Sequence, residues 1–329
     1  MKPFSCAIVG ASGMVGGMFL KVLEERKLPI SELHLFASSR SAGQSLKFNN
    51  QEIVIEELTP TVFDHKKIDF ALFATDSDTS KKYAPIAVNA GCVVIDNSSA
   101  WRMDDDVPLV VPEVNSGDLK NHKGIIANPN CCAAPSVVAL KPLLNAYGLE
   151  RVVISTYQSV SGAGVGGIPD LKNTLNGGLP QYFPHIIAGN LIPHIDVFHD
   201  DGYTGEEKKL MAEIRKMLHS PTLPITATTV RVPVEFGHSL SINVTLSKAF
   251  ELNDVRKILI NAPGVVLQDD IKNSLYPMPL TAAGTDDVYV GRIRRDESFP
   301  NSLNLWVVSD NTRKGAATNV VQIVEFLQV

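Results

Sequence analysis

The fold of this chain is constrained most by its first apolar segment, which runs directly into a glycine-rich turn. Cys6-Ala7-Ile8-Val9 is followed by Gly10-Ala11-Ser12-Gly13-Met14-Val15-Gly16. This order is typical of a buried strand that turns at once into a helix. The alternation continues, with strands expected at 32–37, 68–74 and 92–96 and helices at 18–26 and 81–90. Strands and helices that alternate over short connections predict a parallel sheet with both faces covered.

The pattern changes after Leu144. A strand at 151–157 and a glycine-rich loop at 161–167 precede alternating segments at 227–234, 239–246, 288–294 and 303–308, with one polar helix at 204–218 and a helical tail at 315–327. We therefore predict the α/β class, with a Rossmann-type dinucleotide-binding domain plus an α+β domain that contains a mixed sheet. The first domain is expected to comprise residues 1–130 with 311–329, and the second residues 131–310.

The composition excludes several classes of protein. The 329 residues carry a formal net charge of −5, which argues against a nucleic-acid partner. No apolar stretch reaches the ~20 residues that a membrane span requires, so no membrane partner is expected. Four cysteines in a chain of this length, two of them adjacent, do not make a disulfide framework. A reducing, cytoplasmic setting is therefore expected.

The glycine turn is a candidate nucleotide site because it follows a strand and opens a helix. Gly10 permits a tight turn, Gly13 lets the backbone approach a pyrophosphate, and Gly16 allows the helix to pack closely on the strand. The spacing G-x-x-G-x-x-G differs from G-x-G-x-x-G, so a plain strand-to-helix turn is the alternative. The candidate cofactor-binding residues of this turn are Gly10, Ala11, Ser12, Gly13, Met14, Val15 and Gly16.

The loop after the second expected strand indicates which dinucleotide binds. It offers Ser38, Arg40 and Ser41 and no carboxylate. An acidic residue here would hold a ribose 2′-hydroxyl, whereas an arginine accommodates a 2′-phosphate. We therefore predict NADP rather than NAD as the cofactor. The alternative for Arg40 is a solvated loop side chain.

The segment Asn128-Pro129-Asn130-Cys131, followed by Cys132 and an apolar run, most clearly indicates chemistry. We expect Cys131 at the first turn of a helix, where free backbone N–H groups and the helix dipole stabilise a thiolate, the form that attacks carbonyl carbon. The alternative is a buried structural cysteine that caps a core helix. His238 is either the base for this chemistry or a surface histidine in a turn.

Several motifs together resemble those of the aspartate-β-semialdehyde dehydrogenase family. They occur in the family's order over residues 8–325: Trp101–Met103, Val107–Asn115, Asn128–Cys131, Tyr157–Gly164, Arg231 seven residues before His238, Gly291–Arg294, and Asp310-Asn311 before Arg313–Ala317. The resemblance implies NADP-dependent reductive dephosphorylation of 4-phospho-L-aspartate to L-aspartate 4-semialdehyde and phosphate, in lysine, methionine and threonine biosynthesis. It also implies a homodimer, in which the second domain is catalytic and supplies the interface.

The same resemblance implies a role for each polar residue of these motifs. Cys131 would be the nucleophile that forms a thioester, and His238 would accept and donate the proton. The residues that bind the amino-acid part of the substrate would be Gln158, Glu206 and Arg231. Those that bind the phosphate would be Arg102, Asn130 and Lys209. Those beside the nicotinamide would be Ser161, Gly162 and Asn311, and no metal is expected.

Three departures from the family pattern bear on rate and cofactor affinity. Cys132 stands where the family usually has Ser or Thr, which exposes two vicinal thiols to mispairing or oxidation. Leu240 stands where a glutamate is common, and if that glutamate tunes His238 in the family, its absence here would affect the turnover rate. Asp76 and Asp78 would weaken NADP binding if they lay near the 2′-phosphate.

Other functions are the alternatives. N-acetyl-γ-glutamyl-phosphate reductase carries out the same chemistry on a longer, acetylated substrate. That family usually has glycine before its cysteine, where this chain has Asn130, and an acetamide needs no carboxylate partner such as Glu206. The adjacent Glu207 is the alternative candidate for the carboxylate that binds the amino-acid part of the substrate. From a different class, the chain could be a non-catalytic NADP-binding paralogue, or a redox sensor that uses Cys131 and Cys132.

Overall fold

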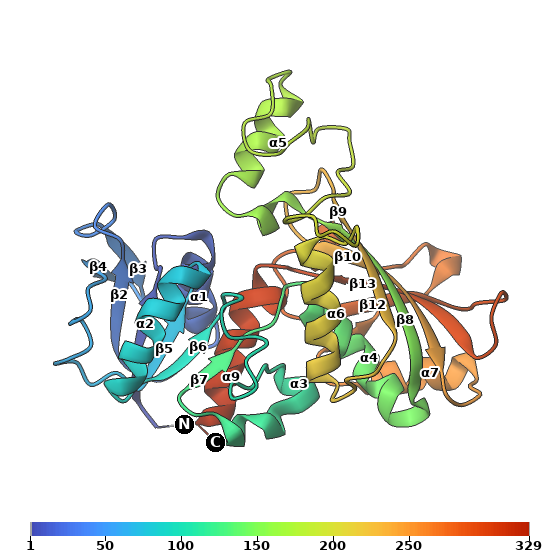
Figure 1. The fold of residues 1–329 in the computed structure, drawn as a ribbon, viewed down its shortest axis with the longest axis horizontal. Coiled ribbons are helices and arrows are strands. Elements are labelled where there is room, and N and C mark those ends of the chain that lie inside the picture. The colour runs from blue at the N-terminus through green and yellow to red at the C-terminus, as the bar shows by residue number, and fades with distance from the viewer. Residues whose placement is uncertain (1, 329) are drawn as a thin grey trace. The chain divides into compact units, whose positions relative to one another are not determined.

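The computed structural model describes residues 2–328, and the chain divides into two compact units (Figure 1). Unit 1 contains residues 2–129 and 316–328, and unit 2 contains residues 130–315. The boundaries expected from the sequence lie at 130/131 and 310/311, and those between the compact units lie at 129/130 and 315/316. In residues 2–328, no helix is both long and apolar enough to cross a membrane.

Unit 1 is built on a seven-stranded sheet in the order β3-β4-β2-β1-β5-β6-β7. Its strands are β1 (Phe4–Val9), β2 (Ile30–Ala37), β3 (Ser45–Phe48), β4 (Gln51–Glu57), β5 (Phe70–Phe73), β6 (Val93–Asp96) and β7 (Ile125–Ala127). Its helices are α1 (Met14–Glu25), α2 (Ser77–Asn89), α3 (Pro112–Asn115) and α9 (Thr318–Leu327). In this spatial order, every neighbouring pair from β4 through β2, β1, β5 and β6 to β7 is parallel, and β3 alone is antiparallel to its neighbour β4. The prediction of a Rossmann-type domain is confirmed.

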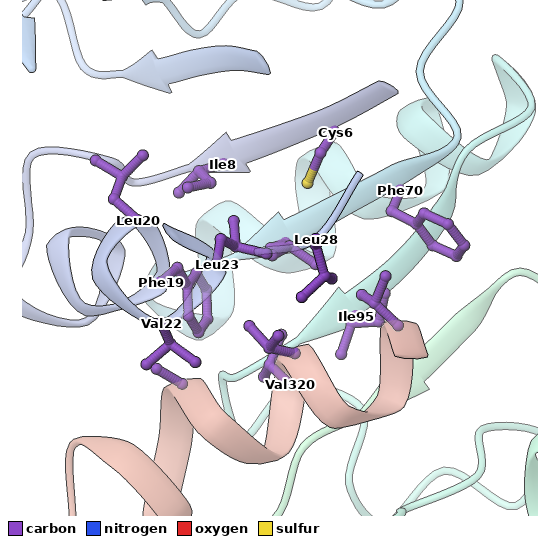
Figure 2. Close-up of a cluster of buried hydrophobic side chains, with 14 of the residues drawn as sticks. Cys6, Ile8, Phe19, Leu20, Val22, Leu23, Leu28, Phe70, Ile95 and Val320 are labelled. Atoms are coloured by element: carbon purple, nitrogen blue, oxygen red, sulfur yellow. The ribbon is translucent and has the colours of Figure 1, made fainter. Parts of the chain in front are cut away.

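Alternation along β1 sends its side chains into two separate cores. Cys6 and Ile8 pack on one face of the sheet with residues of α1 and α9, among them Val320 (Figure 2). Ala7 and Val9 pack on the opposite face, which α2 covers. Because both faces are covered, the strands are continuous apolar runs, and ligands can approach only at the ends of the strands.

Unit 2 contains a six-stranded mixed sheet in the order β11-β12-β13-β10-β8-β9, as predicted for the second domain. Its strands are β8 (Leu149–Gln158), β9 (Ile225–Arg231), β10 (His238–Leu246), β11 (Val265–Leu267), β12 (Val288–Arg295) and β13 (Ser302–Ser309). Strand β10 is antiparallel to β8 and β13, whereas β9 is parallel to β8. Its helices are α4 (Ala133–Tyr147), α5 (Gly167–Leu175), α6 (Gly205–Met217), α7 (Leu252–Ile260) and α8 (Pro279–Ala282).

The side chains along β8 of this sheet alternate in burial. Val152 and Ile154 are buried, whereas Val153, Ser155 and Tyr157 are half-buried. Helix α4 packs against β10, β12 and β13, and α6 packs against β9. One face of the sheet is therefore covered by helices of unit 2, and the other is partly open.

Two helices of unit 1 begin earlier than predicted, for local reasons. Helix α1 begins at Met14 rather than Met18, because the glycine turn itself opens the helix. Helix α2 begins at Ser77 rather than Lys81, because the Asp76 carboxylate accepts a backbone N–H of the first turn and caps the helix. Both starts extend the helices toward the ends of the parallel strands.

The polar helix predicted at 204–218 is confirmed as α6, and the sequence analysis missed two further helices of the second domain, α5 and α7. Strand β9 ends at Arg231, three residues earlier than expected, and Pro233, which has no N–H for a sheet, follows. The expected loop at 161–167 contains a 3-10 turn at Val160–Ala163. The C-terminal tail is not one helix, since a π-helical turn at Arg313–Ala317 precedes α9.

Candidate active site

The glycine turn between β1 and α1 leaves no room for side chains at two positions. Gly10 has φ +88°, and a Cβ on it would lie 2.5 Å from the Ala74 carbonyl oxygen. A Cβ on Gly16 would lie 2.3 Å from the Gly10 carbonyl oxygen. Gly13 is the N-cap of α1, and no side chain caps this helix. Backbone N–H groups at its N-terminus are therefore available to an anion, which suits the pyrophosphate of a dinucleotide.

The loop after β2 presents the residues expected to discriminate between cofactors. Ser38 and Arg40 are exposed, and Ser41 is half-buried. The Arg40 guanidinium makes no hydrogen bond or ion pair with another residue of the described chain. Asp76, expected to disfavour NADP, is held by the backbone and hydroxyl of Thr79 at 2.9 and 3.0 Å. The loop thus offers one positive charge without a paired carboxylate.

Cys131 lies just before helix α4 and not in its first turn as predicted. The helix begins at Ala133, with Cys132 as its N-cap. Asn130 Oδ1 accepts the N–H of Cys132 at 2.8 Å and that of Ala133 at 3.4 Å. These are the donors that the sequence assigned to a thiolate, and Asn130 already occupies them. The negative charge on Cys131 must therefore be stabilised in another way.

Neighbouring side chains provide that stabilisation. The pKa of Cys131 is lowered well below the usual thiol value, chiefly because the Cys132 thiol donates a hydrogen bond to its sulfur. The charges of His238 and Arg231 lower the pKa of Cys131 further and, together with that hydrogen bond, outweigh the effect of burial. Burial and the same hydrogen bond raise the pKa of Cys132 well above the usual value. Cys131 is therefore the more acidic thiol of the pair and the one that ionises first.

His238 is fully buried at the start of β10, and one edge of its ring faces Ser159. The Ser159 backbone N–H donates to His238 Nδ1 at 3.0 Å, and Ser159 Oγ lies at the same distance from Nδ1. Ser159 Oγ donates to Asn311 Oδ1 at 3.0 Å, an oxygen that also accepts the Gly237 N–H. The Ser159 N–H can thus donate to Nδ1 of the neutral ring, and Ser159 Oγ can accept from Nδ1 of the charged ring.

The other edge of the His238 ring faces the thiols. Its Nε2 has no hydrogen-bond partner among the described residues. One ligand atom from each of Cys131, Cys132 and His238 lies within 4.8 Å of the other two. A Cβ on Gly162 would lie 2.9 Å from His238 Nε2 and 3.1 Å from Arg231 Nη1. Glycine at this position therefore keeps the space beside both side chains clear.

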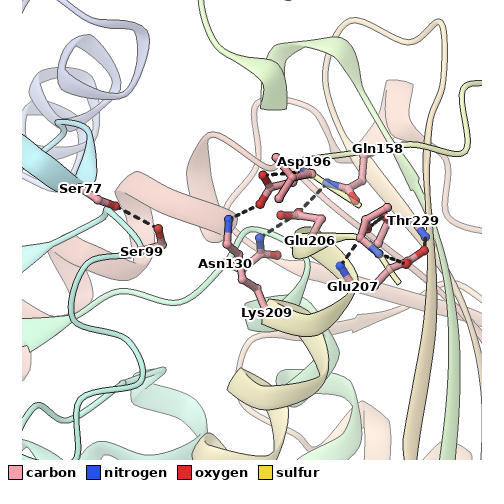
Figure 3. A network of polar contacts seen from close by, with 11 residues as sticks. Ser77, Ser99, Asn130, Gln158, Asp196, Glu206, Glu207, Lys209 and Thr229 are labelled. Carbon is pink, nitrogen blue, oxygen red and sulfur yellow. Dashed lines mark hydrogen bonds and ion pairs between the residues drawn. The ribbon is translucent and has the colours of Figure 1, made fainter. Parts of the chain in front are cut away.

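Two adjacent glutamates at the start of α6 have different environments (Figure 3). Glu207 closes the capping box of the helix and accepts the Thr229 N–H at 2.9 Å. Glu206 accepts Nδ2 of Asn130 at 2.9 Å and Nε2 of Gln158 at 3.0 Å, both at Oε1. Within the described chain, Oε2 of Glu206 has no hydrogen-bond partner. Glu206 is therefore the one that can bind a ligand.

A cavity of about 350 Å³ in unit 2 has both signs of charge on its wall. Its lining includes Gly162, Tyr182, Asp196, Glu206, Lys209 and Arg231. The Arg231 side chain is buried, and its Nη1 donates to the Ser159 carbonyl oxygen at 2.7 Å. The remaining N–H groups of this planar fork are suited to a carboxylate. A guanidinium and a carboxylate on one cavity are complementary to a zwitterionic amino acid.

The residues predicted to bind phosphate belong to both units. In unit 2, Lys209 Nζ forms an ion pair with Asp196 Oδ2 at 2.6 Å. In unit 1, the Arg102 side chain is buried, and its Nε and Nη2 donate to the carbonyl oxygens of Asn128 and Asn97, each at 2.9 Å. The backbone therefore fixes the orientation of the Arg102 guanidinium.

Sequence reasoning missed two residues of this site, Ser159 and Asp196. Ser159 follows the predicted site residue Gln158, so its place in the motif was a usable signal. Asp196 lies in the irregular segment between α5 and α6, where no local pattern marks it. Leu240, noted as a departure from the family pattern, is fully buried in β10. A glutamate there would have to be accommodated in the same buried place.

Two family models match the chain. The model described as semialdehyde dehydrogenase, NAD binding domain, matches residues 5–122, and the dimerisation domain model matches residues 140–314. The aspartate-semialdehyde dehydrogenase of Aquifex aeolicus is 53% identical, with 98% of both chains covered. That of Legionella pneumophila is 49% identical, with 99% of this chain and 96% of the relative covered.

Solved structures agree with these matches. Aspartate semialdehyde dehydrogenase II of Vibrio cholerae, complexed with ASA, is 43% identical and has a TM-score of 0.95, with 100% of this chain and 99% of that chain covered. The Candida albicans aspartate semialdehyde dehydrogenase with NADP is 27% identical and has a TM-score of 0.77, with 99% of each chain covered.

An NAD-binding domain followed by a dimerisation domain, each matched by its own family model, defines a semialdehyde dehydrogenase by class. Identity near 50% along the whole length narrows that class. The chain belongs to the aspartate-semialdehyde dehydrogenase family.

Proposed function

We propose that this chain is an NADP-dependent aspartate-semialdehyde dehydrogenase. It would interconvert 4-phospho-L-aspartate and NADPH with L-aspartate 4-semialdehyde, phosphate and NADP, in the biosynthesis of lysine, methionine and threonine. One observation carries the proposal. Cys131, a thiol of lowered pKa, neighbours His238 in a unit whose cavity presents Arg231 and Glu206 to an amino acid.

The charges of the cavity would orient the substrate. Arg231 keeps donors free beside the one used by the Ser159 carbonyl, and these would bind the α-carboxylate in two parallel hydrogen bonds. Glu206 Oε2 would accept from the ammonium group. The Thr156 hydroxyl donates to Gln158 Oε1 at 2.9 Å and so fixes the Gln158 amide. This amide donates to Glu206 and would hold the Glu206 carboxylate in place beside the substrate. The substrate's carbonyl carbon would then face Cys131.

Attack of the Cys131 thiolate on the acyl phosphate would form a C–S bond as the C–O bond to phosphate breaks. Lys209 would stabilise the leaving phosphate, for which it must share or exchange its ion pair with Asp196. Asn130 has a second Nδ2 hydrogen for the same phosphate. Sulfur suits this step because a thioester is more readily reduced than the ester that a serine would form.

Reduction of the thioester would use a proton from His238. When bound, NADPH would supply the hydride to the thioester carbon. His238 would protonate the resulting oxyanion through Nε2, and would take the proton back as the thiohemiacetal collapses and releases the Cys131 sulfur. Ser159 and Asn311 would keep the Nδ1 edge of the ring satisfied in both charge states. The proton would thus enter and leave on the substrate side.

Several finer points rest on support of different kinds. NADP is favoured over NAD by the uncompensated charge of Arg40. A homodimer is favoured by the match of unit 2 to a dimerisation domain and by the partly open face of its sheet. The cytoplasmic setting and the roles of Arg102, Ser161, Gly162 and Asn311 toward phosphate and nicotinamide stay predictions.

A product assay tests the proposal. The oxidation of NADPH and NADH is followed with 4-phospho-L-aspartate and with N-acetyl-γ-glutamyl phosphate, and the aldehyde is identified. We expect turnover with the first substrate and NADPH, and an Arg40→Ser variant that loses roughly tenfold or more in its preference for NADPH over NADH. Turnover with the acetylated substrate alone would establish the reductase instead. Tight NADPH binding without any turnover would establish a non-catalytic paralogue.

A further inference from the structure

The second thiol of the pair, Cys132, forms no bond to substrate in the proposed reaction. It is fully buried, directly after Cys131 in the chain. Both sulfurs lie within 4.8 Å of each other, and Cys131 is partly exposed. The chain therefore holds two sulfur atoms next to each other, on a pair of residues of which Cys131 is the partly exposed one.

We propose that Cys131 and Cys132 form a binding site for monosubstituted trivalent arsenicals. Arsenic in such a compound is soft and bonds to sulfur in preference to oxygen or nitrogen. It keeps one carbon substituent and has two further bonds to give, so its requirement is two thiols close together. The cysteine pair meets that requirement with no third ligand.

A three-ligand metal site is less well supported by the same cluster. To bind a metal, His238 must offer a lone pair at Nε2, because Nδ1 faces Ser159. The Ser159 backbone N–H donates to Nδ1 at 3.0 Å, so the neutral ring carries its proton on Nε2. In that state the imidazole offers a donor toward the sulfurs and no lone pair. The cluster thus presents two ligands and a hydrogen-bond donor.

A one-atom bridge also fits these neighbouring residues better than a direct disulfide. The described chain has no cis peptide bond, so the Cα atoms of Cys131 and Cys132 are about 3.8 Å apart. Disulfides usually need roughly 4.4–6.8 Å between Cα atoms. Insertion of one arsenic atom between the sulfurs relieves this constraint, because it enlarges the ring by one large atom and replaces one S–S bond by two As–S bonds.

The reaction with phenylarsine oxide balances without an oxidant. The Cys132 S–H bond and the arsenic–oxygen bond break, and two As–S bonds form, one of them from the Cys131 thiolate. The oxygen leaves as one water molecule, with the proton of Cys132 and one proton from solvent, to which Cys131 lost its own proton on ionisation. Arsenic remains trivalent and both sulfurs remain at their thiol oxidation level. The partly exposed Cys131 would react first, and Cys132 would then close the ring as an intramolecular partner of high effective concentration.

The test is intact-protein mass spectrometry of the full chain with phenylarsine oxide. The wild type should gain one phenylarsenic group and lose two hydrogens. This adduct should survive excess 2-mercaptoethanol and disappear with the dithiol 2,3-dimercaptopropanol. In Cys132→Ser and Cys131→Ser, we expect the apparent affinity for phenylarsine oxide to fall roughly 100-fold or more, because a single sulfur cannot chelate the arsenic. An adduct in Cys132→Ser that resists 2-mercaptoethanol as in the wild type would overturn the proposal.

Two further variants identify the ligands. Cys92→Ser removes one of the two buried cysteines of unit 1, Cys6 and Cys92, of which Cys92 contributes to the raised pKa of Cys6. This variant should keep the adduct, and loss of it would move the site to unit 1. His238→Asn should also keep the adduct, since the imidazole is not a ligand in this proposal. Loss of binding in that variant would replace the two-sulfur site by a three-ligand one.

A protection experiment on the wild type keeps the test independent of how the variants fold. With phenylarsine oxide bound, iodoacetamide should leave both Cys131 and Cys132 unmodified in the peptide map. Modification of Cys132 under these conditions would overturn the proposal. None of these measurements uses turnover, so their outcome is separate from that of the proposed dehydrogenase activity.

Discussion

The two units of this molecule carry their functional groups in different ways. In unit 1, the candidate cofactor turn is one continuous segment, Gly10–Gly16, and it acts through backbone geometry. In unit 2, the candidate active site brings together side chains from separate elements: Cys131, Gln158, Glu206, Arg231 and His238. The first kind of site is formed as soon as one turn folds. The second exists only after the mixed sheet has formed.

Register within the mixed sheet is what assembles the second site. Gln158, the last residue of β8, pairs with Arg231, the last residue of β9. His238 is the first residue of β10, which runs antiparallel to β8. Strand pairing alone therefore brings the three residues to the same end of three neighbouring strands. A shift of one residue in the register of a strand would turn its side chain to the opposite face of the sheet. The proposed reaction therefore requires the observed pairing of these strands.

The largest expected effect separates the two sites by function. Cys131→Ala removes the nucleophile from unit 2 and touches nothing in the glycine turn. We expect turnover to fall by at least ~10⁴-fold, while the affinity for NADPH, measured by fluorescence titration, stays close to that of the wild type. Turnover within roughly tenfold of the wild type would place the nucleophile elsewhere.

The next effect tests how strictly the backbone of unit 1 is constrained. A Cβ at Gly16 would lie 2.3 Å from the Gly10 carbonyl oxygen, whereas a Cβ at the adjacent Gly17 meets nothing within 4 Å. We expect Gly16→Ala to lower the free energy of unfolding by roughly 3 kcal/mol, because backbone must move. Gly17→Ala should raise it by about 0.5–1 kcal/mol. Urea denaturation measures both, and equal effects would contradict this account of the turn.

This difference between the units also explains what the sequence could predict. The β1–turn–α1 segment follows from local pattern, and so do most strands of the parallel sheet. The β3–β4 hairpin was missed because its strands are mostly exposed and polar. Its turn holds Asn49 and Asn50 at φ 48° and 64°, which asparagine tolerates. That pair was the available local signal, but the polar and apolar alternation beside it, Ser45-Leu46-Lys47-Phe48, extends over only four residues.

The third prediction concerns geometry in unit 2. Arg231→Lys keeps the charge but replaces a planar fork by a single ammonium group. We expect KM for L-aspartate 4-semialdehyde to rise roughly 10–100-fold with little change in kcat, because the α-carboxylate loses its two-pronged partner. Steady-state kinetics measures the split between the two constants. The matched control is Arg294→Lys, since Arg294 is exposed and donates to the Arg292 carbonyl oxygen. An unchanged KM in Arg231→Lys would remove the assigned role.

The types of residue in the active site could be predicted from motifs, but their partners could not. The sequence favoured Glu206 over Glu207 by spacing alone, and the physical reason is the capping box that engages Glu207. The sequence also attributed the Cys131 thiolate to a helix N-terminus. The Asn130 side chain occupies those N–H groups, and a side chain can do so only in a particular rotamer, which no pattern of residue types specifies.

The prediction with the smallest expected effect tests which groups stabilise the Cys131 thiolate in place of a helix N-terminus. Because the hydrogen bond from Cys132 is the chief cause of the lowered pKa of Cys131, Cys132→Ala should raise that pKa, and Cys132→Ser, which keeps a donor, should raise it less. The thiolate is the form that iodoacetamide alkylates, so in the wild type alkylation of Cys131 should persist below the range near pH 8.5 in which ordinary thiols ionise. It should decline only as the pH falls through the lowered pKa.

Peptide mapping across a pH series measures these midpoints for each variant. Cys92 is the internal reference, because burial raises its pKa to about 11 and it should react only at higher pH. The same depression of the Cys131 pKa has a consequence for stability. The ionised thiol stabilises the fold at a pH above the unfolded thiol pKa, and this contribution is lost as the pH falls through the folded value. If both variants react as the wild type does, His238 and Arg231 alone hold the thiolate, and the neighbouring sulfur contributes nothing to its charge.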